Sequence, residues 1–487
     1  MKSHLEIEAK YDVAEAQSLP DLIGVGGVTS IVAQATRVLT AVYFDTPGHD
    51  LGAAGVTLRR RTGGTDDGWH LKLTLARGER LELHRPLGVR QSPPAALRAL
   101  VRAFVRSSPL LAVATLTNRR TVHLLLGGDG RVLAELADDS VTGERHDVDT
   151  APMVWREVEV ELVEGDREVL AALDAAVRKG GAVPAVGASK VGRVLGDAPA
   201  EVSRGRRTPV SEVFDADVRQ AVLQVLAADP LVRLDRPAAA TRMAAALRRL
   251  DACLAVQQRV APDDSRGSIR AELAWLDAVV APVAELDPVR VRLLEALRAE
   301  PVELVLAPVR RRIVRDLAAA RRSALTDVRK ALDSPRYLDL VQRLLDLRVE
   351  PSAAAARAVD VVPKVAAREL RRAQRRLAGS RLQERGPLAA AERAVAQARY
   401  AASAEQPDGA LSAVLDELSA IVADLRVSAR TQDLLRELAV SAHLAGENTF
   451  TLGRLHGLEQ LTAGELHRRL RPLRKKLKRI GATARHP

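Results

Sequence analysis

Charged side chains occupy every second position near the start of the chain. Glu6, Glu8 and Lys10 alternate with apolar residues, and a period of two is the spacing of a β-strand, so the three side chains share one face. Two carboxylates about 7 Å apart along a strand can hold a hard divalent cation, and the neighbouring ammonium can contact an anion bound to that cation. An exposed edge strand shows the same alternation, so a binding site here requires partners elsewhere in the chain.

Later segments carry charges in the same alternating phase. The carboxylates that this phase directs to one side are Glu135, Glu157, Glu159 and Glu161. The cations are Arg59, Arg61, Lys72, one of Arg119 and Arg120, Lys190 and Arg193. Burying so many charges is prohibitive without counter-charges, so we infer that the bound partner is a polyanion together with a metal ion. The guanidinium of arginine donates two hydrogen bonds to phosphate oxygens, the ammonium of lysine supplies a point charge, and carboxylates bind Mg²⁺ or Mn²⁺.

The elements that must position these residues are predicted to be strands. Alternating residues bounded by Gly, Pro and Asp turns predict strands at residues 4–10, 37–45, 56–61, 69–75, 116–126, 132–138 and 154–163, with helical segments at 94–106 and 166–178. About eight antiparallel strands with charges on one face are typical of a closed barrel with a wet interior. We therefore expect residues 1–197 to form a charged tunnel.

A different organisation follows a polar linker at residues 198–208. Helical periods dominate residues 209–487, with helices predicted at 211–228, 237–256, 289–298, 302–332, 337–347, 352–378, 388–403, 411–425, 431–443 and 462–480. The formal net charge is +12, but residues 1–200 contain 24 Lys and Arg against 26 Asp and Glu. The basic character therefore belongs to residues 201–487, which contain 50 against 36.

Two basic stripes each lie on a single helix face by their spacing. One consists of Lys364, Arg368, Arg371, Arg372 and Arg375, and the other of Arg468, Arg471, Lys475 and Lys478. Solvated helix faces often look the same, but two stripes in one basic domain favour an anion-binding groove. Aromatic residues make up only 2% of the chain, which argues against base stacking and so against nucleic acid as the ligand.

The cellular setting is predicted from what the sequence does not contain. Glu6 lies where a signal peptide needs an apolar run, and no apolar stretch reaches the roughly 18 residues of a membrane helix. We therefore expect a cytoplasmic protein without a membrane partner. The single cysteine, Cys253, excludes an intramolecular disulfide.

Several motifs in the same order make residues 1–197 resemble a CYTH domain, the fold of the triphosphate tunnel metalloenzymes. The matching motifs are Glu6-x-Glu8-x-Lys10, Tyr43-Phe44-Asp45-Thr46-Pro47, Leu58-Arg59-Arg60-Arg61, Trp69-His70-Leu71-Lys72, Glu157-Val158-Glu159-Val160-Glu161-Leu162 and Ser189-Lys190. The resemblance implies an eight-stranded antiparallel tunnel barrel that handles triphosphate-bearing substrates with Mg²⁺ or Mn²⁺.

The same resemblance implies a role for each matching position. The metal ligands would be Glu6, Glu8, Glu157, Glu159 and Glu161. The triphosphate-binding residues would be Lys10, Arg59, Arg61, Lys72, Arg119, Arg120, Lys190 and Arg193. The catalytic set would be Glu6, Glu8, Lys10, Glu159 and Glu161. The implied reaction is in-line attack of water on a terminal phosphorus, with a glutamate of the metal cluster as the expected base.

Residues 209–487 resemble a CHAD domain, a helical module that binds inorganic polyphosphate through basic helices. The supporting segments are Ser334-Pro335-Arg336-Tyr337, residues 446–456 and the basic helix after Glu465-Leu466-His467. The first basic helix of a CHAD domain reads H-x-x-R-V-x-x-R-R-L-R, and here Thr241, Ala244 and Asp251 replace three of its residues. We therefore expect polyphosphate contacts from Arg248, Arg249 and the two stripes, with Pro472 interrupting the last helix.

We interpret the chain as an α+β protein of two domains, a metal-dependent hydrolase of inorganic triphosphate joined to a helical polyphosphate-binding domain. Polyphosphate granules are then a candidate place of association in the cytoplasm. A non-catalytic polyphosphate-binding protein stays open as an alternative. So does an enzyme acting on thiamine triphosphate or a nucleoside triphosphate, including an adenylate cyclase, and the oligomeric state is left open as well.

Overall fold

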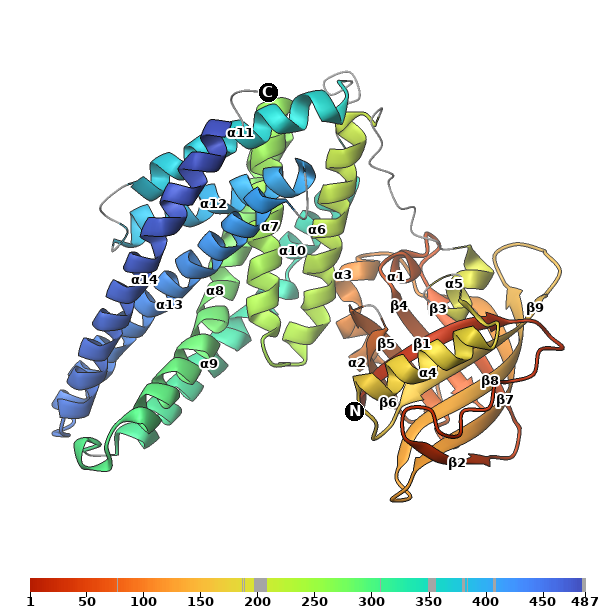
Figure 1. Cartoon of the computed structure of the whole chain (residues 1–487). Helices are drawn as coiled ribbons and strands as arrows, with labels where there is room; N and C mark the ends of the chain where they lie inside the picture. The colour runs from red at the N-terminus through yellow and green to blue at the C-terminus, as the bar shows by residue number, and fades with distance from the viewer. Residues whose placement is uncertain are drawn as a thin grey trace. The chain divides into compact units, whose positions relative to one another are not determined.

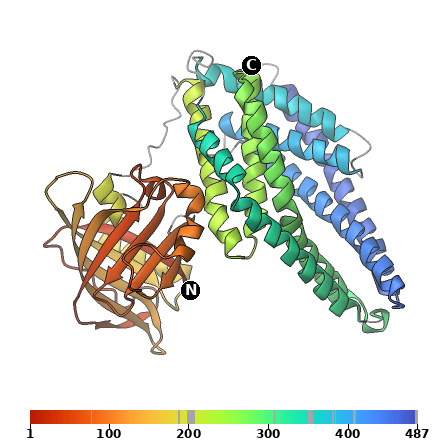
Figure 2. The same cartoon turned by 180° about the vertical axis from the view of Figure 1, so that it is seen from behind.

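The computed structural model describes residues 1–76, 78–185, 187, 189–196, 208–306, 308–348, 356–378, 382, 384–405 and 409–483, with side chains to residue 480. The chain divides into two compact units, Met1–Glu201 and Val202–Pro487 (Figures 1 and 2). The first contains a β-barrel and the second is helical, so the predicted fold class is confirmed. The expected linker, residues 198–208, lies outside the described residues apart from Thr208.

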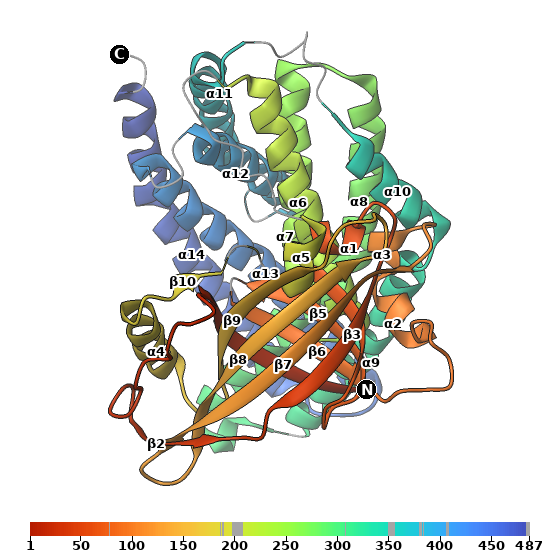
Figure 3. The same cartoon turned by 90° about the vertical axis from the view of Figure 1, so that its right-hand side faces the viewer.

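Eight strands close the barrel of the first unit. Their order round the ring is β1-β6-β5-β4-β3-β7-β8-β9, and antiparallel pairing of β9 with β1 completes it (Figure 3). The ring strands are β1 (Lys2–Val13), β3 (Arg37–Asp45), β4 (Val56–Thr62), β5 (Gly68–Ala76), β6 (Glu79–Arg85), β7 (Leu111–Gly127), β8 (Val132–Arg145) and β9 (Met153–Leu162). Two short strands lie off the ring, β2 (Val28–Ala33) on β7 and β10 (Val183–Pro184) on β1.

Strand β1 changes partner at its middle. Residues 2–7 pair with β6, and residues 8–13 pair with β9. The predicted strand at 4–10 is therefore extended in both directions. The strands β2, β6 and β10 were not predicted, and β6 is the important omission because it belongs to the ring.

Short helices surround and fill the barrel. They are α1 (Asp50–Ala53), α2 (Ala95–Leu100), α3 (Arg102–Val105), α4 (Arg167–Lys179) and α5 (Lys190–Leu195). Helix α4 packs Leu173 and Val177 in a core that also contains Tyr11 of β1 and Val158 of β9. Helix α5 instead packs beside Ala41 and Leu116, which line the barrel interior, so it fills part of that interior.

The second unit is an array of helices in which sequence neighbours pack together. Its elements are α6 (Val210–Arg233), α7 (Ala239–Val260), α8 (Asp264–Ala299), η1 (Val302–Leu304), α9 (Val309–Leu332), α10 (Pro335–Asp346), α11 (Ala358–Ala378), α12 (Arg385–Glu405), α13 (Ala410–Leu444) and α14 (Phe450–Thr483). None of the helices in the described part of the chain is both long and apolar enough to span a membrane.

Four helix predictions are wrong in the second unit. The helix expected at 302–332 begins only at Val309, after the short η1, because Pro308 precedes it, and the helix expected at 289–298 is the last part of α8. The helices expected at 411–425 and 431–443 are one continuous helix, α13, because the residues between them include no glycine or proline. Helix α14 continues through Pro472 instead of being interrupted there. Proline removes one intrahelical hydrogen bond, and burial of Leu470, Leu473 and Leu477 in the core offsets that loss.

Candidate active site

A cavity of about 240 Å³ lies inside the barrel, and most of its lining is charged. We call this cavity the tunnel. Its carboxylates are those of Glu6, Glu8, Asp66, Glu82, Glu135, Glu159 and Glu161, and its cations are Lys10, Arg59, Arg61, Lys72, Arg80, Arg120 and Lys190. The tunnel reaches solvent beside His4 and Asp66, whose side chains are 62% and 50% exposed. Both lie at the same end of the ring, since β1 begins opposite His84 and Nε2 of His84 lies beside the turn that contains Asp66, and Glu6 and Glu8 follow further along β1, where they are buried.

Most of the predicted site residues line the tunnel together, but three do not. Arg119 is exposed on the outside of β7, so only Arg120 of that pair faces inward. Arg193 forms an ion pair with Asp12, and its guanidinium carbon lies 5.2 Å from the centroid of the Trp155 ring. The predictions that Arg119 and Arg193 bind substrate are therefore not supported by the geometry.

Glu157 is the third exception. It shares the inward face of β9 with Glu159 and Glu161 but lies outside the tunnel lining, where its Oε2 accepts a hydrogen bond of 2.6 Å from Nε1 of Trp155. Its Oε1 lies 2.5 Å from Nζ of Lys190. The side chain is buried beside these two partners, so Glu157 supports Lys190 and does not line the tunnel.

Four charged residues of the barrel interior were not singled out from the sequence, and one of them, Asp66, lies in the turn between β4 and β5. Arg80 and Glu82 lie on β6, and both line the tunnel. Asp139 lies on β8, one residue beyond the predicted end of that strand, and is fully buried. The alternating charges of Arg80 and Glu82 gave a usable signal, since they have the same period of two as Glu6 and Glu8.

One row of carboxylates crosses three adjacent strands. Glu161 of β9 lies directly opposite Glu8 of β1 on one side and Glu135 of β8 on the other. Side chains in such cross-strand positions start about 5 Å apart, and Glu6 follows Glu8 on the same strand face. Among the described residues, Nε2 of His4, at 3.4 Å, is the only side-chain nitrogen found within ion-pair distance of Glu161.

This row carries more negative charge than its surroundings compensate. Burial, reinforced by Glu6, raises the pKa of Glu161 to about 8. Burial also raises the pKa of Glu6, although Lys72 opposes the shift. Burial opposes ionisation of Glu8, but Lys10, 3.2 Å away, lowers its pKa. A divalent cation would neutralise the charge that Glu161 and Glu135 add to this row, so Glu6, Glu8 and Glu161 fit Mg²⁺ or Mn²⁺, with Glu135 beside them.

A second carboxylate cluster is already neutralised by an ammonium group. Oxygens of Asp139, Glu157 and Glu159 lie within 4.8 Å of one another, which is close enough to share a cation. Nζ of Lys190 lies 3.1 Å from Asp139, 2.5 Å from Glu157 and 2.7 Å from Glu159. Burial opposes ionisation of Glu159, but Lys10, Lys190 and Arg120 lower its pKa well below the usual range. The geometry therefore favours the Glu8–Glu161 row as the metal site over Glu157 and Glu159.

Three of the seven tunnel cations, Arg59, Arg61 and Lys72, lie on β4 and β5, across the ring from β8 and β9. Nη1 of Arg59 donates to the Tyr43 hydroxyl at 3.2 Å, and Nζ of Lys72 donates to both oxygens of Glu6 at 2.7 and 2.8 Å. Burial, together with neighbouring Arg59, lowers the pKa of Arg61 to about 9. A bound anion would stabilise a guanidinium in this position, so β4 and β5 offer a phosphate-binding wall across the ring from Glu135 and Glu161.

The raised pKa of Glu161 predicts a pH-dependent metal affinity. Below pH 8 the metal-free carboxyl is protonated, so a divalent cation that binds there must displace a proton. We expect the apparent affinity for Mn²⁺ to rise about tenfold per pH unit up to pH 8 and to level above it. Calorimetric titration of metal-free protein between pH 6 and 9 measures this. The Glu161→Gln variant should lose the slope, and an unchanged slope in that variant would contradict the assignment.

Two family models match this chain, the CYTH domain over residues 4–179 and the CHAD domain over residues 216–425. The chain therefore belongs to the family of proteins that join a CYTH domain to a CHAD domain. An uncharacterized protein of Mycobacterium tuberculosis, found in strains CDC 1551 and H37Rv, is 33% identical over 508 residues, covering 99% of this chain and 98% of its own length.

Solved structures with lower similarity were also found. PptA from Streptomyces chartreusis is 20% identical with a TM-score of 0.46, and the match covers 56% of this chain and all of that one. The CHAD domain from the plant Ricinus communis is 17% identical with a TM-score of 0.44, covering 58% of this chain and 96% of its own.

Proposed function

We propose that the barrel unit is a divalent-metal-dependent hydrolase of inorganic triphosphate. The observation that carries the proposal is the separation of charge in the tunnel. Glu161 of β9 and Glu135 of β8 form no ion pair with a lysine or arginine among the described residues, while Arg59, Arg61 and Lys72 lie across the ring on β4 and β5. A metal bound to a short phosphate chain neutralises both sets at once. Membership of the CYTH family supports the same substrate chemistry.

The proposal gives each side of the tunnel a role. Glu6, Glu8 and Glu161 would hold the metal, which supplies charge neutralisation at phosphate oxygens when bound. The residues proposed to bind the phosphate chain are Lys10, Arg59, Arg61, Lys72, Arg80, Arg120 and Lys190. Lys10 lies between the two sets because its Nζ is 3.2 Å from Glu8. Water attacks the terminal phosphorus in line, the bridging P–O bond breaks, and a tunnel glutamate accepts the proton of the water.

The aromatic content of the tunnel favours an inorganic substrate. Tyr43 is the only aromatic residue other than His4 among the described residues that line the tunnel, and it is buried with its hydroxyl bonded to Arg59. Recognition of a nucleobase or a thiazolium ring commonly uses an exposed aromatic face. The tunnel walls therefore match the shared triphosphate better than an attached organic group.

The direct test compares three substrates with and without metal. Purified protein is incubated with tripolyphosphate, thiamine triphosphate or ATP, each with Mg²⁺, with Mn²⁺ and with a chelator, and released phosphate is measured. We expect release only with metal and fastest from tripolyphosphate. Faster release from one of the other two would reassign the substrate. Binding of tripolyphosphate without release from any of the three would support the non-catalytic alternative.

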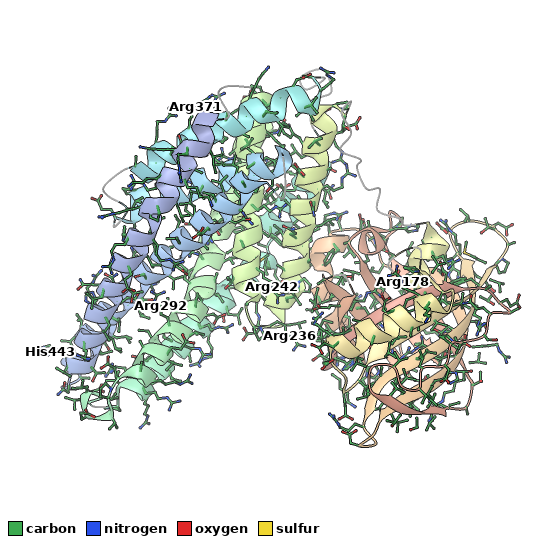
Figure 4. All side chains as sticks on the ribbon, in the orientation of Figure 1. Arg178, Arg236, Arg242, Arg292, Arg371 and His443 are labelled. Atoms are coloured by element: carbon green, nitrogen blue, oxygen red, sulfur yellow. The ribbon has the colours of Figure 1, made fainter. Side chains whose placement is uncertain are left out.

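We also propose that the helical unit binds inorganic polyphosphate through its two basic stripes. All nine stripe residues are exposed, and Arg468, 3.5 Å from Glu465, is the only one that forms an ion pair within the described part of the chain. The stripes lie on neighbouring helices, since Gln374 of α11 donates to the carbonyl oxygen of Leu477 of α14 at 3.0 Å. Arg371, on α11, is labelled in Figure 4.

The first basic helix contributes less to such a surface. Arg248 of α7 already has two carboxylates near it, Asp277 at 3.5 Å and Glu392 at 3.9 Å. Asp251, at a position where a CHAD domain has arginine, accepts from Nε of Arg270 at 2.7 Å. A polyanion would have to displace these carboxylates, so the exposed stripes are the better site.

Because the stripe residues are exposed while Arg248 is already paired, removing charges from the stripes should weaken polyphosphate binding more than removing the charge of Arg248. Replacing Arg371, Arg375, Lys475 and Lys478 together by glutamine should weaken binding of long-chain polyphosphate on the order of 30-fold at low salt and flatten its salt dependence. The matched control, Arg248→Gln, should change affinity less than about twofold. Fluorescence anisotropy with labelled polyphosphate at two salt concentrations measures both. The reverse ranking of the two proteins would place the site at α7.

A further inference from the structure

The turn between β4 and β5 is fixed to the rim of the barrel. Gly63 has φ of +94°, and a Cβ added there would lie 2.2 Å from the carbonyl oxygen of Val38, so only glycine fits. Nε2 of His70 lies 3.0 Å from the carbonyl oxygen of Asp66, and Nε2 of His84 lies 3.3 Å from that of Asp67. The buried strand histidine His70 therefore anchors the backbone of this turn.

The two acidic residues of the turn point to different partners. The carboxylate of Asp67 accepts a hydrogen bond from the backbone N–H of Gly64 at 2.8 Å and so closes the turn. The carboxylate of Asp66 instead forms an ion pair with Arg61 and lines the tunnel. Its side chain is also half exposed, so it lies where the tunnel meets solvent.

Asp66 thereby occupies the guanidinium of Arg61, one of the residues proposed to bind phosphate. Arg61 is buried beside Arg59, and its Nε atom has no hydrogen-bond partner among the described residues. Asp66 is also the only carboxylate that forms an ion pair with Arg61 within the described part of the chain. An arriving phosphate group must displace that carboxylate, while the anchored backbone keeps the carboxylate close to the opening.

We propose that Asp66 determines chain-length specificity, admitting triphosphate to Arg61 and repelling the additional phosphates of a longer linear polyphosphate. The inference rests on the proposed triphosphatase function. When triphosphate fits inside the tunnel, one of its phosphates takes the place of the Asp66 carboxylate on Arg61, so one anion replaces another. A longer chain extends out of the tunnel through this opening, so its additional phosphates lie beside the displaced carboxylate of Asp66. Solvent screens the charges only partly there, and the carboxylate and the phosphates repel each other.

The turn supplies its own matched pair of variants. Asp66→Asn and Asp67→Asn each remove one negative charge from the same turn, and asparagine can still accept the Gly64 hydrogen bond at position 67. We expect Asp66→Asn to raise the ratio of kcat/KM for linear polyphosphates longer than triphosphate to that for tripolyphosphate about two- to fivefold, mainly through KM. Asp67→Asn should leave that ratio unchanged. Equal shifts in both variants, or none in Asp66→Asn, would overturn the proposal.

Two further measurements separate this inference from the proposed hydrolysis. Calorimetry in the presence of a chelator reports binding of tripolyphosphate and of longer chains without turnover, and Asp66→Asn should favour the longer chains there as well. If the wild type binds but releases no phosphate, the hydrolysis proposal fails while this result still decides the role of Asp66. In an Arg61→Gln background the effect of Asp66→Asn on this ratio should persist, because the carboxylate repels the additional phosphates directly, and its disappearance would overturn that repulsion.

Discussion

Replacing Glu6 by glutamine is expected to abolish metal-dependent phosphate release from tripolyphosphate while leaving the barrel folded. The change removes a charge from the proposed metal site with almost no change in side-chain volume. Both carboxylate oxygens of Glu6 accept from Nζ of Lys72, and the carboxamide can keep one of these hydrogen bonds. We expect kcat/KM to fall about 10²-fold or more, as when one transition-state partner is removed from an active site. Initial rates over a range of Mg²⁺ concentrations measure the loss.

The control for this variant lies on the outside of the same barrel. Glu144 is an exposed residue of β8, and Glu144→Gln removes the same charge far from the tunnel lining. That variant should keep wild-type turnover. A melting temperature of Glu6→Gln close to the wild-type value distinguishes loss of a ligand from loss of the fold. Full turnover in a folded Glu6→Gln protein would remove Glu6 from the metal site.

Replacing Lys190 by methionine should give the largest loss of stability among the tunnel variants. Its ammonium is buried beside Asp139, Glu157 and Glu159, and those carboxylates raise its pKa against the effect of burial. Methionine keeps most of the aliphatic chain but leaves three buried carboxylates without this cation. Removing one partner of a buried ionic cluster costs about 3–5 kcal/mol of unfolding free energy. Urea unfolding at neutral pH measures the difference.

The same variant should gain a response to metal. Oxygens of the three carboxylates lie within 4.8 Å of one another, so Mn²⁺ could take the place of the missing ammonium. We expect Mn²⁺ to restore part of the stability lost by Lys190→Met. The control Lys179→Met, at an exposed position at the end of α4, should be as stable as the wild type. A Lys190→Met protein of wild-type stability would show that the cluster does not depend on this lysine.

Local patterns were enough to predict β1 and β9, the strands that carry the Glu6-x-Glu8-x-Lys10 motif and the three alternating glutamates of residues 157–161. Glu6 and Glu8 on β1, and Glu159 and Glu161 on β9, alternate with apolar residues that pack outside the barrel, and that alternation is a property of neighbouring residues alone. Strand β6 has the same alternation at Arg80 and Glu82 but follows directly after a glycine turn. The sequence of this short strand therefore carries the same signal as β1 and β9.

Properties that depend on distant pairing could not be predicted in the same way. Which of Arg119 and Arg120 faces inward depends on the register of β7 with β3 and β8, which a single strand does not encode. The pairing of Arg193 with Asp12 joins segments far apart in the sequence. For the same reason Arg248 could be predicted to lie on a basic helix face, but its neighbours Asp277 and Glu392 could not be predicted.

The change of partner within β1 has a consequence for how the site is made during folding. Lys10 and Glu159 form an ion pair across 149 positions of sequence, and Glu8 lies where β1 begins to pair with β9. Contacts this distant in sequence form slowly because a long loop must close first. A nascent chain that has not yet extended through β9 thus has its first two carboxylates but no opposing Glu161. Metal affinity should therefore arise in one step with ring closure, and opening of the β1–β9 seam should release metal and phosphate chain together.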